Sequence, residues 1–146
     1  MRDTATRVLL AILLVDSALV GLWAALAPHS FYDDFPGAGR HWVSADGPFN
    51  EHLVRDVGVL NLALAAVVLA ALVRPSRYLV QVAAGAALIY AAPHFLYHLF
   101  HLDLYEASDK VLQTASLAVT VAVPVALLVR TWRQPVDSLA QGRARP

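Results

Sequence analysis

The stretch Tyr90-Ala91-Ala92-Pro93-His94-Phe95-Leu96-Tyr97-His98-Leu99-Phe100-His101 places three histidines, at spacings of four and three residues, at the end of a long apolar segment. At about 100° per residue, a helix would gather Tyr90, the three histidines and Tyr105 within roughly one quarter of its circumference. Imidazoles inside a membrane-spanning segment are costly unless other polar groups compensate them. The stretch therefore predicts a polar site at one end of a membrane-spanning helix.

The composition is that of a small integral membrane protein. Of 146 residues, 58% are hydrophobic and only 15% are charged, whereas soluble domains are roughly 45–50% apolar. The formal net charge is zero, so no nucleic-acid partner is expected. The chain has no cysteine, which excludes disulfides, thiolate metal ligands and thiol catalysis. The lipid bilayer is the expected partner of most of the chain.

Four apolar segments, at about 5–27, 50–73, 78–102 and 109–131, reach the length of about 20 residues that a spanning helix needs. A long loop with turn signals, a tight turn and a short acidic connector separate them. Such short connections predict an all-α, membrane-embedded, antiparallel four-helix bundle over residues 1–133. Residues 134–146 are polar and are predicted to form a disordered cytoplasmic tail.

The basic residues predict how the bundle is oriented. One side of the predicted membrane region carries Arg2, Arg7, Arg74, Arg77, Arg130, Arg133, Arg143 and Arg145. The other side carries only Arg40, Arg55 and Lys110. By the positive-inside rule, this predicts a multi-pass protein of the cell membrane with both termini in the cytoplasm and the long first loop outside.

The first segment also has features of a secretory signal peptide. It starts with arginine and ends at a small-residue motif that resembles a cleavage site. However, Asp16 interrupts the apolar run, and Pro28 would occupy the first position after cleavage. We therefore expect this segment to remain as the first spanning helix.

A metal site is the first hypothesis for the histidine stretch. The spacing of His94 and His98 is that of two histidines on one helix face that bind the same ion. The second helix is expected to enter the membrane at similar depth, and its start could complete the ligand set. The predicted metal ligands are His94, His98, His101, Glu51, His52 and Asp56. Nitrogen and oxygen ligands without sulfur suit Zn, Fe, Mn or Cu, so the site could be redox-linked.

Two alternatives remain open. The first is haem or quinone binding, in which His52 pairs with His94 or His98 and the aromatic residues, Tyr90 among them, line a flat ligand. The second is a non-catalytic scaffold, partner subunit or homo-oligomer, whose histidines are structural or sense pH. In that case the start of the second helix forms simple pairs, Glu51 with Arg55 and His52 with Asp56. No serine or threonine has a recognisable nucleophile context. The sequence leaves open whether the protein is an enzyme of another kind.

Two further residues inside the apolar segments have predicted roles. Asp16 lies at about the same depth as Asn61, Tyr90 and Thr120. It is either a neutral, hydrogen-bonded group that fixes helix register or part of a proton relay leading to His94. Pro93 is expected to kink the third spanning helix just before its histidines.

The run Arg55-Asp56-Val57-Gly58-Val59-Leu60-Asn61-Leu62-Ala63-Leu64-Ala65 resembles the Arg-x-x-Gly segment of DoxX-like small four-helix membrane proteins. The chain length and the layout of four spans are similar as well. The resemblance implies the same bundle architecture, a link to quinone-dependent oxidation, and a cofactor-binding role for Arg55. The dense histidine stretch is not a general feature of that family.

Overall fold

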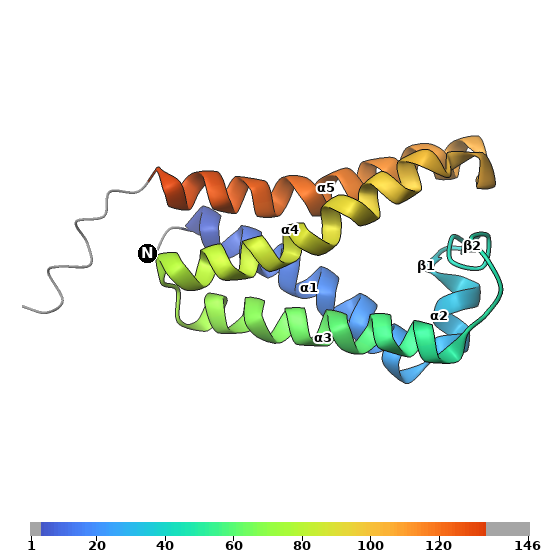
Figure 1. Cartoon of the computed structure of the whole chain (residues 1–146), viewed down its shortest axis with the longest axis horizontal. Coiled ribbons are helices and arrows are strands. Elements are labelled where there is room, and N and C mark those ends of the chain that lie inside the picture. The colour runs from blue at the N-terminus through green and yellow to red at the C-terminus, as the bar shows by residue number, and fades with distance from the viewer. Residues whose placement is uncertain (1–3, 134–146) are drawn as a thin grey trace, which may run out of the picture.

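The computed structural model describes residues 4–133, which form four long helices (Figure 1). These are α1 (Thr4–Leu26), α3 (Glu51–Val73), α4 (Arg77–Phe100) and α5 (Ala107–Trp132). All four are long and apolar enough to cross a membrane, with mean hydropathies between 1.5 and 2.3. The all-α fold is therefore confirmed. The predicted tail, residues 134–146, lies outside the described residues.

Two of the long helices begin at side-chain caps. The Asn50 side chain accepts a hydrogen bond from the Leu53 amide at 3.1 Å, and this starts α3. The Ser76 hydroxyl accepts one from the Leu79 amide at 3.1 Å, and this starts α4 directly after the tight turn. Such caps satisfy backbone N–H groups that have no partner inside the helix. The short polar connectors therefore fix where these helices start.

The helices are arranged as two antiparallel pairs. α1 packs along α3 and α4 along α5, whereas contacts between the pairs are fewer (Figure 1). Gly58 allows the close approach of α1 and α3, because a Cβ there would lie 2.9 Å from backbone atoms of Ala24 and Ala25. The pairs are joined by a core to which all four helices contribute, including Leu10, Val68 and Leu127, all fully buried. This core lies toward the end where the described chain starts and finishes, here called the terminal end (Figure 1).

The opposite end, called the hairpin end, carries residues 27–50 and 101–106. We predicted a loop with turn signals from Pro28 to Pro48, and this segment contains in addition α2 (Pro28–Asp34) and a small antiparallel hairpin, β1 (Pro36–Gly37) with β2 (Arg40–His41). Proline is well suited to the first position of a helix, which explains the start of α2. The hairpin turn uses two glycines with positive φ. This segment therefore folds compactly across the ends of the helices.

Three contacts hold the hairpin segment to α4, to α5 and to Tyr105 in the connector between them. Arg40 forms an ion pair with Asp109 at the start of α5. The Tyr97 hydroxyl donates to Asp46 at 3.1 Å, and the Tyr105 hydroxyl donates to the Trp42 carbonyl at 3.0 Å. The segment consequently bridges the space between the two helix pairs.

α4 bends in its second half, which contains Pro93, and from there it runs beside α5 rather than α3 (Figure 1). The helix ends at Phe100 and is followed by a short 3-10 turn, η1 (Leu102–Leu104). We expected the helix to reach about residue 102. The shorter helix leaves His101 as its cap residue and places Tyr105 beyond it, so the predicted helical stripe stops at His98.

Candidate functional site

A cavity of about 670 Å³ lies between the two helix pairs and extends to the hairpin end. All four long helices and the hairpin segment contribute to its wall, which is mainly aliphatic and aromatic. Its polar lining residues are Asp16, Ser17, Trp42, Asp46, Asn61, Tyr90, His94, His98, Gln113, Ser116 and Thr120. The volume and the mixture of a broad apolar wall with few polar groups are typical of small-molecule sites.

His94 and His98 are the two predicted site histidines that line the cavity. Their ring centroids are 4.7 Å apart in an edge-to-face arrangement, and the His94 ring also stacks on Tyr90 at 5.3 Å. Asp46, from the hairpin segment, is close enough to interact electrostatically with both imidazoles. The second half of α4 therefore supplies a row of three hydrogen-bonding rings along one wall.

His101 takes a different position from the one predicted. As the cap residue of α4, it directs its Nδ1 at the Tyr97 carbonyl oxygen, 2.7 Å away. Its ring stacks on the Tyr97 ring with a centroid distance of 4.1 Å. It does not line the cavity, because its ring packs on Tyr97 instead of lying beside His98.

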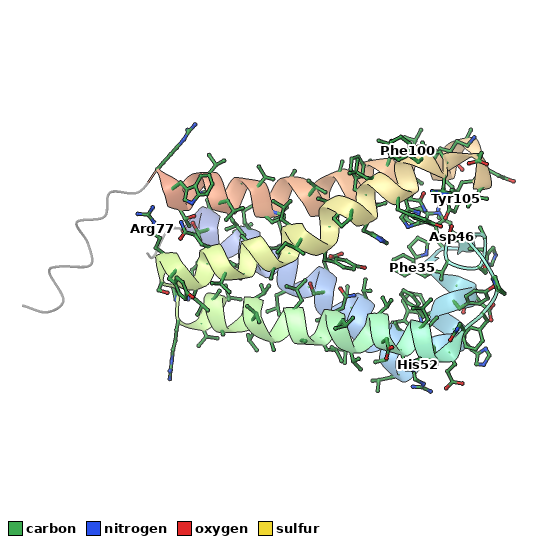
Figure 2. All side chains as sticks on the ribbon, in the orientation of Figure 1. Phe35, Asp46, His52, Arg77, Phe100 and Tyr105 are labelled. Carbon is green, nitrogen blue, oxygen red and sulfur yellow. The ribbon has the colours of Figure 1, made fainter. Side chains whose placement is uncertain are left out.

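The start of α3 does not form the opposite wall that the sequence predicted. Glu51 binds Arg55 at 2.8 Å, and His52 binds Asp56 at 3.3 Å. The His52 side chain is 88% exposed and lies on the side of α3 away from α4 and α5 (Figure 2). None of Glu51, His52 and Asp56 lines the cavity. In this structure, therefore, these three residues do not lie opposite His94 and His98 on the cavity wall.

The physical reason is the rotation of α3 about its axis. The face that lines the cavity carries Leu53, Val57 and Asn61. His52 and Asp56 lie on the order of 100–150° around the helix from that face. Within residues 4–133 there is no group of three or more His, Cys, Asp or Glu side chains that could hold a metal ion. The predicted six-residue ligand set is therefore not assembled.

The two predicted cofactor-binding residues, Tyr90 and Arg55, lie in different places relative to the cavity. Tyr90 lines the cavity, and its hydroxyl is hydrogen-bonded to the Asn61 side chain. Arg55 lies outside the cavity, where it binds Glu51 and donates to the carbonyl oxygen of Ala25 at the end of α1. Together with Gly58, Arg55 thus serves the contact between α1 and α3.

Asp16 lies in the wall of the cavity, as do Asn61, Tyr90 and Thr120, the residues expected at its depth. The Asn61 side chain is 6% exposed and donates to the Val57 carbonyl at 2.9 Å, besides its bond to Tyr90. Asp16 is thus a carboxyl group in the cavity wall, close enough to Tyr90 to interact with it electrostatically.

Sequence reasoning missed Trp42, Asp46 and Gln113. Asp46 and Trp42 both lie in the segment that the sequence predicts to be a loop with turn signals. Gln113 had a usable signal, because it is an amide about one turn into the apolar segment predicted at 109–131. All three line the hairpin end of the cavity. Figure 2 shows Asp46 and Tyr105 near each other at the hairpin end.

Tyr105 connects two of these missed residues. It is 7% exposed and hydrogen-bonds the Gln113 side chain, while its own hydroxyl donates to the Trp42 carbonyl. Burial raises the pKa of Tyr105, and the hydrogen bond from Gln113 opposes this increase. The phenol therefore remains protonated at neutral pH and keeps its donor role.

Comparisons with protein-family models, with curated proteins and with solved structures found no match for this chain. The resemblance to DoxX-like proteins stays a prediction. In this structure the residues that carry the resemblance, Arg55 and Gly58, lie at the contact between α1 and α3 rather than in the cavity.

Proposed function

We propose that this protein is a multi-pass membrane protein that binds a small, largely apolar molecule between its two helix pairs. The observation that carries the proposal is the cavity of about 670 Å³, whose wall is mainly aliphatic and aromatic and whose histidines lie along one side. Among the candidate ligands, a quinone fits best, since its flat ring can contact the apolar wall while its oxygens bind polar side chains.

The charges around the cavity favour an uncharged ligand. Among the described residues that line it, none is lysine or arginine, whereas Asp16 and Asp46 both contribute carboxyl groups. The nearest arginines of the hairpin end are engaged elsewhere, Arg40 with Asp109 and Arg55 with Glu51. An anionic ligand would therefore meet negative charge without a compensating cation. A quinone carries no charge and avoids this penalty.

A metal or haem centre has less support. His94 and His98 are adjacent, but the other four predicted metal ligands lie away from the cavity wall. A metal bound by two imidazoles would need further ligands from water or Asp46. His52 is too exposed on α3 to act as the second axial ligand of a haem near His94. Both possibilities are outcomes of the experiment below.

We further propose that the hairpin end faces the outside of the cell membrane and that both ends of the described chain lie on the cytoplasmic side. Arg74, Arg77, Arg130 and Arg133 all belong to the terminal end. This asymmetry supports the orientation through the positive-inside rule. The cavity would then open toward the outer half of the bilayer.

The experiment is a binding titration of the purified protein in mild detergent. Decylubiquinone should quench tryptophan fluorescence saturably, because Trp42 lines the cavity. His94→Ala and His98→Ala should each weaken binding by at least about tenfold, which corresponds to the loss of one good hydrogen bond. His52→Ala is the matched control, because that histidine is 88% exposed and outside the cavity, and it should bind like the wild type.

The same preparation discriminates among ligand classes. Mass spectrometry of a solvent extract should detect a co-purified neutral lipid. If decylubiquinone does not bind saturably, or if His52→Ala weakens it as much as His94→Ala, the proposal is wrong. A Soret absorption band, or a stoichiometric metal that His94→Ala removes, would replace the quinone with haem or a metal centre.

A further inference from the structure

Three buried polar atoms without a hydrogen-bond partner gather at the hairpin end of the cavity. They are Trp42 Nε1, His98 Nδ1 and Gln113 Oε1, and among residues 4–133 no other buried side-chain nitrogen or oxygen lacks a partner. Trp42 is 9% exposed and Gln113 is 2% exposed, so solvent does not compensate them. All three residues line the cavity. Buried polar atoms are nearly always paired, so three orphans around one cavity indicate groups that a bound molecule satisfies.

The hydrogen-bonding character of these atoms is largely fixed. The indole nitrogen of Trp42 can only donate. The Tyr105 proton goes to the Trp42 carbonyl, and the amide oxygen of Gln113 is the atom without a partner, so Gln113 has an acceptor available. His98 Nδ1 can act in either role, depending on its tautomer. The cavity end therefore offers one donor, one acceptor and one adaptable nitrogen.

A hydroxyl group matches this set better than other uncharged head groups. The hydroxyl oxygen accepts a hydrogen bond from Trp42, and the hydroxyl proton is donated to Gln113. His98 can then bond to the second lone pair of the same oxygen. A keto oxygen has no proton, so it would leave Gln113 Oε1 unpaired. A carboxylate likewise has no proton to donate, and it would lie near the Asp46 carboxylate, which already interacts with His98.

We propose that Trp42, His98 and Gln113 form a subsite for the uncharged hydroxyl head group of a lipid. The apolar body of that lipid would occupy the deeper cavity, along Leu13, Leu64 and Val123. This inference rests on the proposed function and deepens it, because it selects hydroxyl-bearing ligands over keto and anionic ones. For a quinone, the inference predicts that the reduced, dihydroxy form binds more tightly than the oxidised, diketo form.

The test uses three probes that differ only in the head group: para-nonylphenol, its methyl ether para-nonylanisole, and para-nonylbenzoate. Each is titrated calorimetrically against the full-length protein in lipid nanodiscs. We expect the phenol to bind at least about tenfold more tightly than the ether or the benzoate, the ratio expected for one net hydrogen bond. This ratio is measured on the wild type, so it does not depend on whether any variant folds.

Two variants assign the preference to individual atoms. Gln113→Leu removes the acceptor, so it should abolish the preference for phenol over ether while binding of the ether remains unchanged. Trp42→Phe removes the donor, so it should weaken both probes to a similar extent. His52→Ala, on the exposed side of α3, is the control and should retain the tenfold ratio.

The outcomes separate this inference from the proposed function. If phenol and ether bind saturably but equally well to the wild type, the hydroxyl subsite is overturned and the apolar ligand site stands. If the benzoate binds most tightly, the subsite prefers an anion and the inference is overturned as well. If neither the three probes nor decylubiquinone bind saturably, both the hydroxyl subsite and the proposed function are wrong.

Discussion

The hydroxyl group of Tyr105 connects the hairpin segment to α5. It donates to the Trp42 carbonyl at 3.0 Å and is itself hydrogen-bonded by Gln113. The ring is 7% exposed and lies within 6.4 Å of the His98 ring, measured between centroids. Trp42, His98 and Gln113 are the residues with unpaired polar atoms, so their mutual arrangement depends on this one phenol.

We predict that Tyr105→Phe destabilises the protein by about 0.5–1.5 kcal/mol, the usual net contribution of one hydrogen bond. The change removes only the hydroxyl, so the ring packing is kept and the Trp42 carbonyl loses its donor. Tyr78→Phe is the control, because Tyr78 is 76% exposed and its hydroxyl should contribute little. Thermal denaturation in detergent measures the difference, and equal melting temperatures for the two variants would contradict the prediction.

The same residue gives a pH dependence. Burial raises the pKa of Tyr105 in the folded protein, whereas the unfolded chain has the ordinary tyrosine pKa of about 10. A group whose pKa is raised on folding stabilises the protein fully below the unfolded pKa and loses this effect as the pH rises through the folded pKa. The difference in stability between wild type and Tyr105→Phe should therefore be constant from neutral pH to about 9 and decrease above about 10. A stability difference between wild type and Tyr105→Phe that increases at alkaline pH would contradict a raised pKa for Tyr105.

At the scale of elements, α1 and α3 form the closest helix pair. A Cβ on Gly58 would lie 2.9 Å from backbone atoms of Ala24 and Ala25, a separation that real Cβ atoms essentially never show. Arg55, one turn earlier, donates to the carbonyl of Ala25. Because membrane helices associate largely through close packing and hydrogen bonds, these two residues fix how α3 is rotated against α1.

Gly58→Ala should therefore destabilise the protein by about 1–3 kcal/mol, the usual cost of overpacking a close contact. Gly85→Ala is a matched control in another spanning helix, since a Cβ there meets nothing within 4 Å. Alanine has the better helix propensity, so the control should be neutral or stabilising by up to about 1 kcal/mol. Denaturation of both variants in the same detergent makes the comparison, and a neutral Gly58→Ala would show that the pair is not closely packed.

The bend in α4 decides how far the two helix pairs separate at the hairpin end. Pro93 cannot donate a backbone hydrogen bond, and its ring displaces the preceding turn. A kink of about 20°, acting over the last two turns, displaces the end of α4 by ~3 Å. Beyond the bend α4 follows α5, which leaves the space that becomes the cavity (Figure 1).

We expect Pro93→Ala to straighten α4 and to bring its last turns closer to α3. Spin labels on Val59→Cys and Leu99→Cys report this distance, and they attach specifically because the chain has no other cysteine. Pulsed electron paramagnetic resonance should show a distance shorter by ~3 Å than in the labelled parent. An unchanged distance would mean that packing against α5, rather than the proline, sets the bend.

At the scale of the whole molecule, the protein is a bundle closed at its terminal end and opened at its hairpin end. The core near the terminal end uses residues from all four long helices. The outward faces are apolar, with Leu60 69% exposed, Ile89 79% and Phe100 79%, as expected for helices in contact with lipid. The hairpin segment spans the open end through its contacts with Tyr97, Tyr105 and Asp109.

The proposed orientation predicts which end is accessible from outside the cell. Ala45→Cys, in the exposed hairpin segment, should react in intact cells with a maleimide that cannot cross the membrane. Pro75→Cys, in the turn between α3 and α4, should react only after the membrane is permeabilised. Each variant carries a single cysteine, because the chain has none of its own. The reverse labelling pattern would place the cavity on the cytoplasmic side.

The sequence by itself determined the four long helices, their approximate ends and the presence of a polar row on α4. Each of these depends on local properties: the length of the apolar runs, the caps at Asn50 and Ser76, and the spacing of His94 and His98. Hydropathy and helix periodicity act over one or two turns, so they can be interpreted without knowing what surrounds the helix.

Only the tertiary structure decided which groups meet. The contact of Gly58 with α1 rotates α3 so that Val57 and Asn61 face the cavity, while His52 and Asp56 face away. The convergence of Trp42 and Gln113 depends on a segment that folds back over the helix ends and on a bond to Tyr105. The rotation of a helix and the path of a loop are set by packing between distant parts of the chain, and local sequence patterns do not contain that information.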